Sequence, residues 1–166
     1  MNFLIIFGAK YLYLVIVIAA LWYVSTQPKE QRFRIILAAC FALPLTYVVA
    51  KLMSSFYYDP RPFVVGNFTP LLPHAPDNGF PSDHTLLSAA VAAVVFFFHR
   101  KLGIALFAVA FLVGMARVVA GIHHFIDILG SIIIAFLVTA FFMKYLLAPL
   151  YRYFAPFFLK DVTVDK

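Results

Sequence analysis

Three short polar segments interrupt an otherwise apolar sequence, and their residue types could together carry out phosphoryl transfer. They are Asp59-Pro60-Arg61-Pro62, Pro81-Ser82-Asp83-His84 and Arg117-x3-Gly121-x-His123-x3-Asp127. Ionisable groups kept beside hydrocarbon are costly and usually functional. Two arginines can hold a phosphoryl group, one histidine can attack the phosphorus atom, and a second can protonate the oxygen that leaves. This combination predicts phosphatase chemistry at a membrane.

The third segment contains the candidate nucleophile. We expect one helix to end at Gly121 and the next to begin near His123. The four-residue step from His123 to Asp127 would then place imidazole and carboxylate on one helix face, one turn apart. A carboxylate bonded to one ring nitrogen orients the other, and it stabilises the positive charge that forms when that nitrogen is modified. His123 is therefore the predicted nucleophile and Asp127 its orienting partner.

The other polar residues are candidate phosphate ligands or acids. Arg61 lies between two prolines, which stiffen the backbone and end the preceding helix, so its guanidinium is suited to bidentate phosphate binding. Ser82 is a candidate N-cap, and the free amides of that helix N-terminus would bind an anion. His84 at the rim is the candidate acid, although simple capping beside an interfacial histidine is an alternative for this segment. Asp83 favours a helix N-terminus but would repel a phosphate.

These residues resemble the three signature motifs of the type 2 phosphatidic acid phosphatase superfamily, which also includes bacterial acid phosphatases and vanadium haloperoxidases. The matching segments are Arg61-Pro62, Pro81-Ser82-Asp83-His84 and Ala116-Arg117-Val118-Val119-Ala120-Gly121-Ile122-His123-His124-Phe125-Ile126-Asp127. Three ordered motifs across the middle half of the chain are far more specific than one. The resemblance implies that Arg61 and Arg117 bind phosphate, that His84 protonates the leaving oxygen, and that no metal or other cofactor is needed.

Two positions depart from the common pattern of this superfamily. The pattern places a lysine seven residues before the arginine, where this chain has Ser54. Lys51 lies ten residues before Arg61, nearly a full helical turn deeper, and is the candidate replacement. Asp83 stands where most relatives carry glycine. With Arg61-Pro62-Phe63 and the loop 73–80, Asp83 makes the sequence most similar to the bacterial undecaprenyl pyrophosphate phosphatase branch.

The branch resemblance implies a substrate and a biological role. It implies hydrolysis of undecaprenyl pyrophosphate to undecaprenyl phosphate and inorganic phosphate through a phosphohistidine, a step that recycles the lipid carrier of cell wall (peptidoglycan) biogenesis. Phosphatidic acid or phosphatidylglycerophosphate would use the same catalytic groups. A non-catalytic protein that binds or transports a lipid phosphate is a further alternative. The expected partners are the lipid substrate and membrane lipids, and the sequence gives no indication of an oligomeric state.

Composition independently predicts an integral membrane protein. Hydrophobic residues make up 64% of the 166-residue chain and charged residues only 12%, which is far from the composition of soluble domains. Apolar stretches lie at roughly 3–25, 33–56, 84–99, 102–120 and 124–147, and all are candidates for membrane-spanning helices. We therefore predict a single domain, 1–166, that folds as an all-α bundle of about five transmembrane helices.

The distribution of basic residues predicts the orientation of this bundle. They gather between the first and second stretches, between the third and fourth, and near the C-terminus, at Lys29, Arg32, Arg34, Arg100, Lys101, Lys144, Arg152, Lys160 and Lys166. The positive-inside rule makes these regions cytoplasmic, so that the N-terminus and all three motifs face outside a bacterial plasma membrane. The same bias accounts for the net charge of +6, and no basic stripe predicts nucleic-acid binding. His74 and His99 have no metal-ligand spacing and are interpreted as ordinary polar residues.

Overall fold

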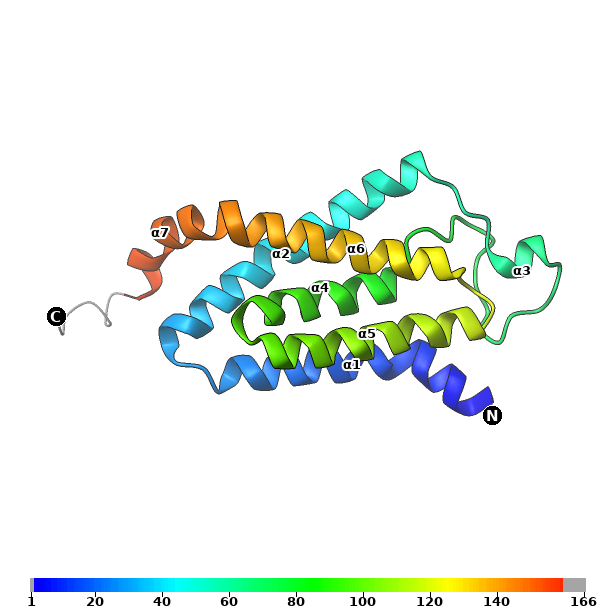
Figure 1. Cartoon of the computed structure of the whole chain (residues 1–166), viewed down its shortest axis with the longest axis horizontal. Helices are drawn as coiled ribbons and strands as arrows, with labels where there is room; N and C mark the ends of the chain where they lie inside the picture. The colour runs from blue at the N-terminus through cyan, green and yellow to red at the C-terminus, as the bar shows by residue number, and fades with distance from the viewer. Residues whose placement is uncertain (1, 160–166) are drawn as a thin grey trace.

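The computed structural model describes residues 2–159 and is a bundle of helices (Figure 1). In chain order the elements are α1 (Asn2–Ser25), α2 (Lys29–Phe56), α3 (Pro62–Val65), α4 (Asp83–Phe98), α5 (Arg100–Val119), α6 (Phe125–Phe141), the π-helical turn η1 (Phe142–Leu146) and α7 (Leu147–Phe158). Within residues 2–159 there is no strand, and one isolated antiparallel bridge joins Pro60 to Asn78. The predicted all-α class is confirmed.

Four helical stretches in the described part of the chain are long and apolar enough to cross a membrane. They are Asn2–Ser25, Lys29–Phe56, Arg100–Val119 and Phe125–Phe158. The remaining long helix, α4, has 16 residues, or about 24 Å at 1.5 Å per residue, against a hydrocarbon core of about 30 Å. The last predicted stretch, 124–147, was too short. The helix continues past Pro149 because the π-helical turn η1 lies where that proline would otherwise disturb the hydrogen-bond ladder.

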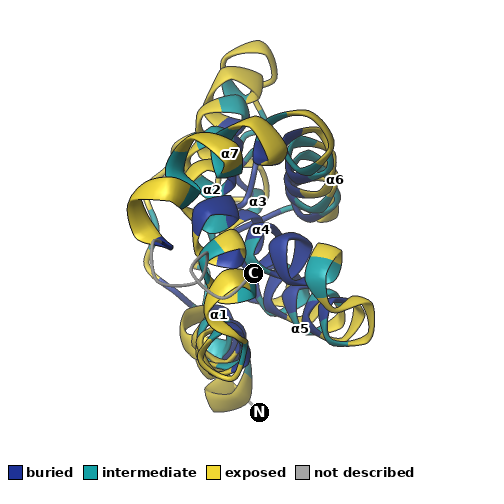
Figure 2. Cartoon of the chain, turned by 90° about the vertical axis from the view of Figure 1, so that its left-hand side faces the viewer, coloured by how far each residue is buried: buried dark blue, intermediate teal, exposed yellow. Residues whose placement is uncertain are grey.

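The short helix α4 forms the centre of the bundle. It packs against α1, α2, α5 and α6, and Figure 2 shows it in the buried colour, surrounded by helices with exposed outer faces. Its buried positions are mostly small, at Thr85, Leu86, Ser88, Ala89, Ala90, Ala92, Ala93, Val94 and Val95. Small side chains let neighbouring helices approach closely, which is how helices associate in lipid. An alanine-rich α4 therefore suits a central position.

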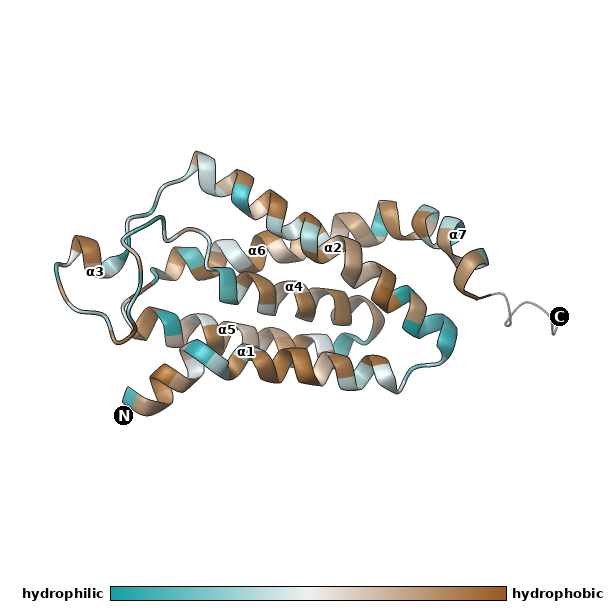
Figure 3. Ribbon diagram, turned by 180° about the vertical axis from the view of Figure 1, so that it is seen from behind, coloured by the Kyte–Doolittle hydropathy of each residue, from teal (hydrophilic) through white to brown (hydrophobic). Residues whose placement is uncertain are grey.

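The outer surface of the bundle is apolar along its length. Many large hydrophobic side chains are exposed on the outer helices, for example Phe3, Trp22, Val48 and Leu137, and only a few are exposed on the central α4. Figure 3 shows the same pattern, with hydrophobic colour along the helices and hydrophilic colour mainly in loops and at helix ends. Such a surface would aggregate in water and is stable against lipid.

The motifs and the basic connections lie at opposite ends of the bundle. The start of α1, the loop between α2 and α4, and the connection between α5 and α6 share one end (Figure 1). The connections α1–α2 and α4–α5, which carry Lys29, Arg100 and Lys101, lie at the other end. Lys160 and Lys166 lie outside the described residues. The sequence-based separation of motifs from the basic connections is therefore present in the fold.

Gly103 gives a test of this packing. A Cβ at Gly103 would overlap the Cα and Cβ atoms of Phe96 and lie 2.6 Å from its backbone nitrogen, so helix backbone would have to move. Although alanine is the better helix former by about 1 kcal/mol, overpacking costs about 1–3 kcal/mol. Gly103→Ala is expected to lower the midpoint of thermal unfolding in detergent by several degrees. Ala105→Val, at an exposed position of the same helix, is the control, and equal midpoints for both variants and the wild type would contradict this packing.

Candidate active site

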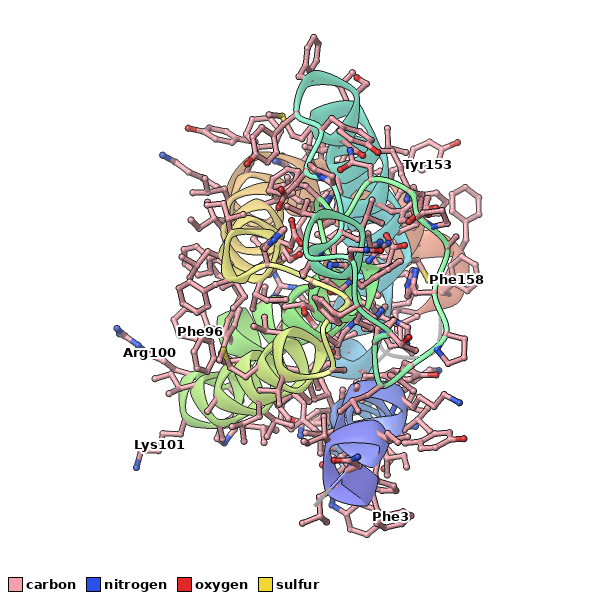
Figure 4. The ribbon with its side chains drawn as sticks, turned by 90° about the vertical axis from the view of Figure 1, so that its right-hand side faces the viewer. Phe3, Phe96, Arg100, Lys101, Tyr153 and Phe158 are labelled. Carbon is pink, nitrogen blue, oxygen red and sulfur yellow. The ribbon has the colours of Figure 1, made fainter. Side chains whose placement is uncertain are left out.

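A polar cavity of about 150 Å³ lies at the motif end of the bundle, under the loop between α2 and α4. Viewed from this end, nitrogen and oxygen atoms gather near the middle of the bundle, and the labelled side chains such as Phe3, Arg100 and Tyr153 lie at its periphery (Figure 4). The cavity is lined by Lys51, Ser54, Arg61, His74, Asp77, Asn78, Phe80, Pro81, Asp83, His84, Arg117 and His123. Six of the eight predicted site residues thus meet at one cavity, and the other two, Ser82 and Asp127, lie behind its wall.

His123 and Asp127 form the predicted pair, but His123 lies before helix α6 and not on it. Their Nδ1 and Oδ2 atoms are 3.1 Å apart, and both side chains are buried. They do not share a helix face, because α6 begins only at Phe125 and His123 belongs to the preceding turn. Gly121, with φ of +78°, makes this turn. Asp127, at the third position of α6, stabilises this helix start, because its Oδ2 also accepts a hydrogen bond from the backbone N–H of the N-cap residue His124, at 2.9 Å.

Two arginines fix the tautomer of His123. Nε2 of His123 lies 3.1 Å from a terminal nitrogen of Arg61 and 3.4 Å from one of Arg117. The same Arg61 nitrogen lies farther from Nδ1, at 3.4 Å, whereas Nδ1 lies 3.1 Å from Asp127 Oδ2. A guanidinium can only donate, so this arrangement favours Nε2 as the acceptor and a ring proton on Nδ1 that is donated to Asp127. Burial, followed by the positive charges of Arg117 and Arg61, lowers the pKa of His123. The ring is therefore neutral, with the Nε2 lone pair on the cavity side, as a nucleophile requires.

Arg61 is held in place by backbone and by the outer loop. Its guanidinium donates to the Ile122 carbonyl at 2.8 Å and, through Nε, to Asp77 Oδ1 at 2.9 Å. A weaker contact of 3.3 Å reaches the Asn78 carbonyl. Burial works against the ionised form of Asp77, but the hydrogen bond and charge of Arg61 outweigh it and lower the pKa of Asp77. Arg61 therefore joins the α5–α6 connection to the loop while facing His123.

Asn78 ties this loop to the end of α2. Its Nδ2 donates to the backbone carbonyl and the hydroxyl of Ser54, at 3.1 and 3.0 Å, and to the Tyr57 carbonyl at 2.9 Å. Its Oδ1 accepts from the backbone N–H groups of Asp59 and Phe80, at 2.9 and 3.0 Å. Ser54, which occupies the position of the superfamily lysine, therefore anchors the loop here.

Arg117 reaches the cavity from α5 and is nearly buried. One terminal nitrogen donates to the Ala9 carbonyl of α1 at 3.0 Å. Gly8 permits this approach, because a Cβ there would lie only 3.1 Å from the Cβ of Ala116. Within residues 2–159, no group accepts from Nε of Arg117. A buried cationic N–H without an acceptor is well suited to binding a phosphate oxygen.

Lys51 and Asp83 meet at the edge of the cavity. Lys51 Nζ lies 3.4 Å from Asp83 Oδ1 and 5.1 Å from the ring centre of Tyr47. Although Lys51 starts deeper on α2 than the superfamily lysine, its side chain reaches the cavity wall. The pair also offsets the negative charge that Asp83 brings to this wall. Both side chains are exposed, so the ion pair itself contributes little to stability.

Ser82 and His84 lie at the start of α4. Ser82 occupies the N-cap position, but its hydroxyl makes no capping bond and instead accepts from Thr85 Oγ1 at 3.1 Å. The hydroxyl is fully buried and does not line the cavity. His84 does line it, and its ring packs edge-on against Tyr13 with ring centres 5.2 Å apart. The predicted acid and the predicted nucleophile thus line the same cavity.

Sequence reasoning missed part of the cavity wall. His74, interpreted as an ordinary polar residue, lines the cavity with its ring 6.2 Å from that of His123. Burial and the charge of Arg61 lower the pKa of His74. Asp77 and Asn78 were also missed as site residues. The polar run 74–79 between apolar segments was the available signal, but nothing in it shows which side chains turn inward.

Asp59, His124 and Asp127 are the one cluster among the described residues with metal-ligand atoms close together, all within 4.8 Å of one another. The Asp59 and His124 side chains already bond each other, since Oδ2 and Nδ1 are 2.9 Å apart. Hydrogen bonding therefore accounts for this cluster.

Comparison with known families agrees with this geometry. The PAP2 superfamily matches residues 34–150, about two thirds of the chain, including all three motifs. The chain belongs to the PAP2 superfamily. This confirms the resemblance that the motifs indicated.

Three proteins show the range of similarity within the superfamily. "Undecaprenyl-diphosphatase BcrC" of Bacillus subtilis is 37% identical over 98 residues, 59% of this chain and 51% of that protein. "Bacitracin transport permease protein BcrC" of Bacillus licheniformis is 30% identical over 85% of this chain and 70% of that protein. The chain thus spans about half the length of the first relative. The crystal structure of Aquifex aeolicus LpxE superposes with a TM-score of 0.67 at 25% identity, covering 87% of this chain and 88% of that one.

The protonation of His123 can be measured directly. Because burial and two arginines lower its pKa, the ring should stay neutral as the pH falls past the ordinary histidine value of about 6.5. In ¹⁵N-histidine-labelled protein we expect a protonated Nδ1 and an unprotonated Nε2 for His123, from about pH 8 to about pH 5. His123→Ala assigns the signal. A ring that titrates near the ordinary value, or carries its proton on Nε2, would show that the arginines do not fix the tautomer.

Proposed function

We propose that the protein is a membrane phosphatase that hydrolyses undecaprenyl pyrophosphate to undecaprenyl phosphate and inorganic phosphate through a phosphohistidine. The observation that carries this proposal is the neutral His123, whose Nε2 lies within 3.4 Å of both arginines in a cavity that also contains His84. Cationic donors beside a nucleophile would hold the phosphoryl oxygens and stabilise the charge that grows on them in the transition state.

In the first step, Nε2 of His123 attacks the terminal phosphorus atom. The bond from phosphorus to the bridging oxygen breaks as the bond from phosphorus to nitrogen forms, and His84 gives a proton to the leaving lipid phosphate. Asp127, bonded to Nδ1 at 3.1 Å, stabilises the positive charge that the ring acquires. The negative charge of the transferring group lies between Arg61 and Arg117.

In the second step, water hydrolyses the phosphohistidine. His84, now without its proton, takes one from the water as the oxygen attacks phosphorus. The nitrogen–phosphorus bond breaks, inorganic phosphate leaves, and Nε2 regains its lone pair. Every step uses side chains of this chain, and the proposed chemistry involves no metal or cofactor.

The remaining predicted ligands have supporting roles in this proposal. Lys51 binds a phosphate oxygen at the cavity edge, where Asp83 orients its ammonium group. Ser82 and Asp83 contribute backbone N–H groups at the N-terminus of α4, which favours an anion. The buried Ser82 hydroxyl, bonded to Thr85, supports this turn from behind.

Adjoining apolar hollows support a lipid as the other end of the substrate. Asp83 also borders a hollow of about 230 Å³ between α2 and α4, lined by Leu43, Thr46, Tyr47, Leu86, Leu87 and Ala90. Leu43 in turn borders a second hollow of about 300 Å³, between α1, α2 and α4. A lipid chain could therefore follow these helices into the membrane while its phosphate occupies the polar cavity. Undecaprenyl pyrophosphate is favoured by the names of two relatives, the B. subtilis protein and "Putative undecaprenyl-diphosphatase YbjG" of Escherichia coli, which is 31% identical over 133 residues.

We further propose that the chain crosses a bacterial plasma membrane five times, with the N-terminus and the active site outside and the C-terminus in the cytoplasm. The positive-inside rule supports this orientation, since the basic connections lie at the end opposite to the cavity. An active site at the outer face would regenerate the lipid carrier of cell wall biogenesis on the side of the membrane where the carrier remains as its diphosphate. Phosphatidic acid, phosphatidylglycerophosphate and non-catalytic binding or transport are the competing functions.

A phosphate-release assay separates these functions. Purified protein in detergent with EDTA is given undecaprenyl pyrophosphate, phosphatidic acid or phosphatidylglycerophosphate. We expect the first to be the preferred substrate, with release that persists in EDTA and falls at least about 10³-fold in His123→Ala, since the nucleophile is lost. His99→Asn, at the opposite end of the bundle, keeps an acceptor for the Leu102 N–H and serves as the matched control. No release from any of the three lipids would favour binding or transport, and release abolished by EDTA would contradict the metal-free mechanism.

A further inference from the structure

A second pair of ionisable side chains lies directly behind His123 and Asp127. Asp59, in the linker after α2, places its Oδ2 2.9 Å from Nδ1 of His124, the N-cap residue of α6. The Asp59 backbone is fixed on both sides, because its N–H donates to Asn78 Oδ1 at 2.9 Å and its carbonyl accepts from the Gly79 N–H at 2.8 Å. The Asp59 side chain is only 14% exposed. The fold therefore presents this carboxyl group to the start of α6.

Asp127 has one oxygen that lacks a donor. Its Oδ2 accepts from His123 and from the backbone of His124, but no donor within residues 2–159 bonds its buried Oδ1. The Asp59 carboxyl lies within hydrogen-bonding range of the Asp127 carboxyl. Two carboxyl groups in contact away from water cannot both be ionised. A proton shared between them would supply the missing donor.

The surroundings indicate which residue carries that proton. Asp127 Oδ2 accepts two hydrogen bonds, from Nδ1 of His123 and from the backbone N–H of His124, and both favour the ionised carboxylate. Asp59 has a single side-chain donor, His124. Burial, and then the negative charge of Asp127, raises the pKa of Asp59. The proton belongs on Asp59.

We propose that Asp59 is a positioning residue that acts as a neutral carboxylic acid, donating to Asp127 and accepting from His124. Hydrogen bonds then run from His124 through Asp59 and Asp127 to His123. With both of its oxygens bonded, Asp127 stays ionised and keeps Oδ2 on Nδ1 of His123, so that Nε2 faces the phosphate. The catalytic effect rests on the proposed function, whereas the effect on the His123 ring does not.

Two substitutions of Asp59 distinguish a neutral acid from an ion-paired carboxylate. Asparagine keeps one donor and one acceptor in the same shape, as a protonated aspartic acid does, whereas leucine keeps the size and removes both. We expect Asp59→Asn to retain kcat within about threefold and Asp59→Leu to lower it about 10–100-fold, as is usual when a residue that orients an active-site group is lost. KM should change little in either variant, because Arg61 and Arg117 still bind the phosphate.

Variants of His124 provide the matching test from the other side. His124→Asn keeps an N–H near the position of Nδ1 and should approach the wild-type kcat, while His124→Leu should resemble Asp59→Leu. Tyr58→Phe, at an exposed position in the same linker, is the control. Thermal midpoints in detergent show whether each variant is folded.

The ¹⁵N spectrum of His123 is recorded for the same proteins and needs no substrate. The proposal expects the wild-type Nδ1–H signal in Asp59→Asn. In folded Asp59→Leu or His124→Leu it expects the same tautomer, with the Nδ1 proton shifted upfield because its bond to Asp127 is weaker. If no lipid phosphate is hydrolysed by any variant, this spectrum still decides the question. If Asp59→Asn lowers kcat as much as Asp59→Leu does, Asp59 acts as an anion and the proposal is overturned. Leucine variants with wild-type kcat and a wild-type spectrum would also overturn it, because Asp59 would then have no positioning role.

Discussion

The structure depends on keeping a buried imidazole neutral beside two permanent positive charges. Arg61 and Arg117 both contact Nε2 of His123, and their positive charges disfavour protonation of that nitrogen. On the other side of the ring, Asp127 accepts a hydrogen bond from the Nδ1–H group. Together they leave one lone pair directed at the place where the arginines would hold a phosphoryl group. Removing any of these contacts would change either the tautomer or the position of the ring.

The bundle supplies these contacts from parts of the chain that are far apart in sequence. Arg117 is held by the Ala9 carbonyl of α1, and Arg61 by the Ile122 carbonyl and by Asp77 of the outer loop. Asn78 joins that loop to the end of α2. Small residues on α4 bring α1, α2, α5 and α6 close enough for their ends to meet. Polar groups at this depth need partners, so the same bonds that fix the site also satisfy the buried charges.

The helices and most of the site could be predicted because their signals are local. Apolar runs of helical length predicted the bundle. Motif spacing predicted candidate site residues such as His84, Arg117 and His123. The inward turn of His74 and the anchoring role of Asn78 depend on how the loop 57–82 folds over the bundle, which no periodicity encodes. α6 begins close to the predicted position, but His123 lies before it and not on its face, because the Asp127 carboxylate caps the helix at His124. Ser82 looks like a capping residue, but its hydroxyl bonds Thr85 in the folded chain.

The central claim is that Nε2 of His123 forms a bond to phosphorus during turnover. Lipid pyrophosphate labelled in its terminal phosphoryl group should be mixed with the protein and quenched rapidly into alkaline detergent, in which a phosphohistidine survives. The account predicts protein-bound label that appears before free phosphate accumulates, is released by acid, maps to His123 and is absent from His123→Ala. Turnover without labelled protein at any time, or label that persists in His123→Ala, would contradict it.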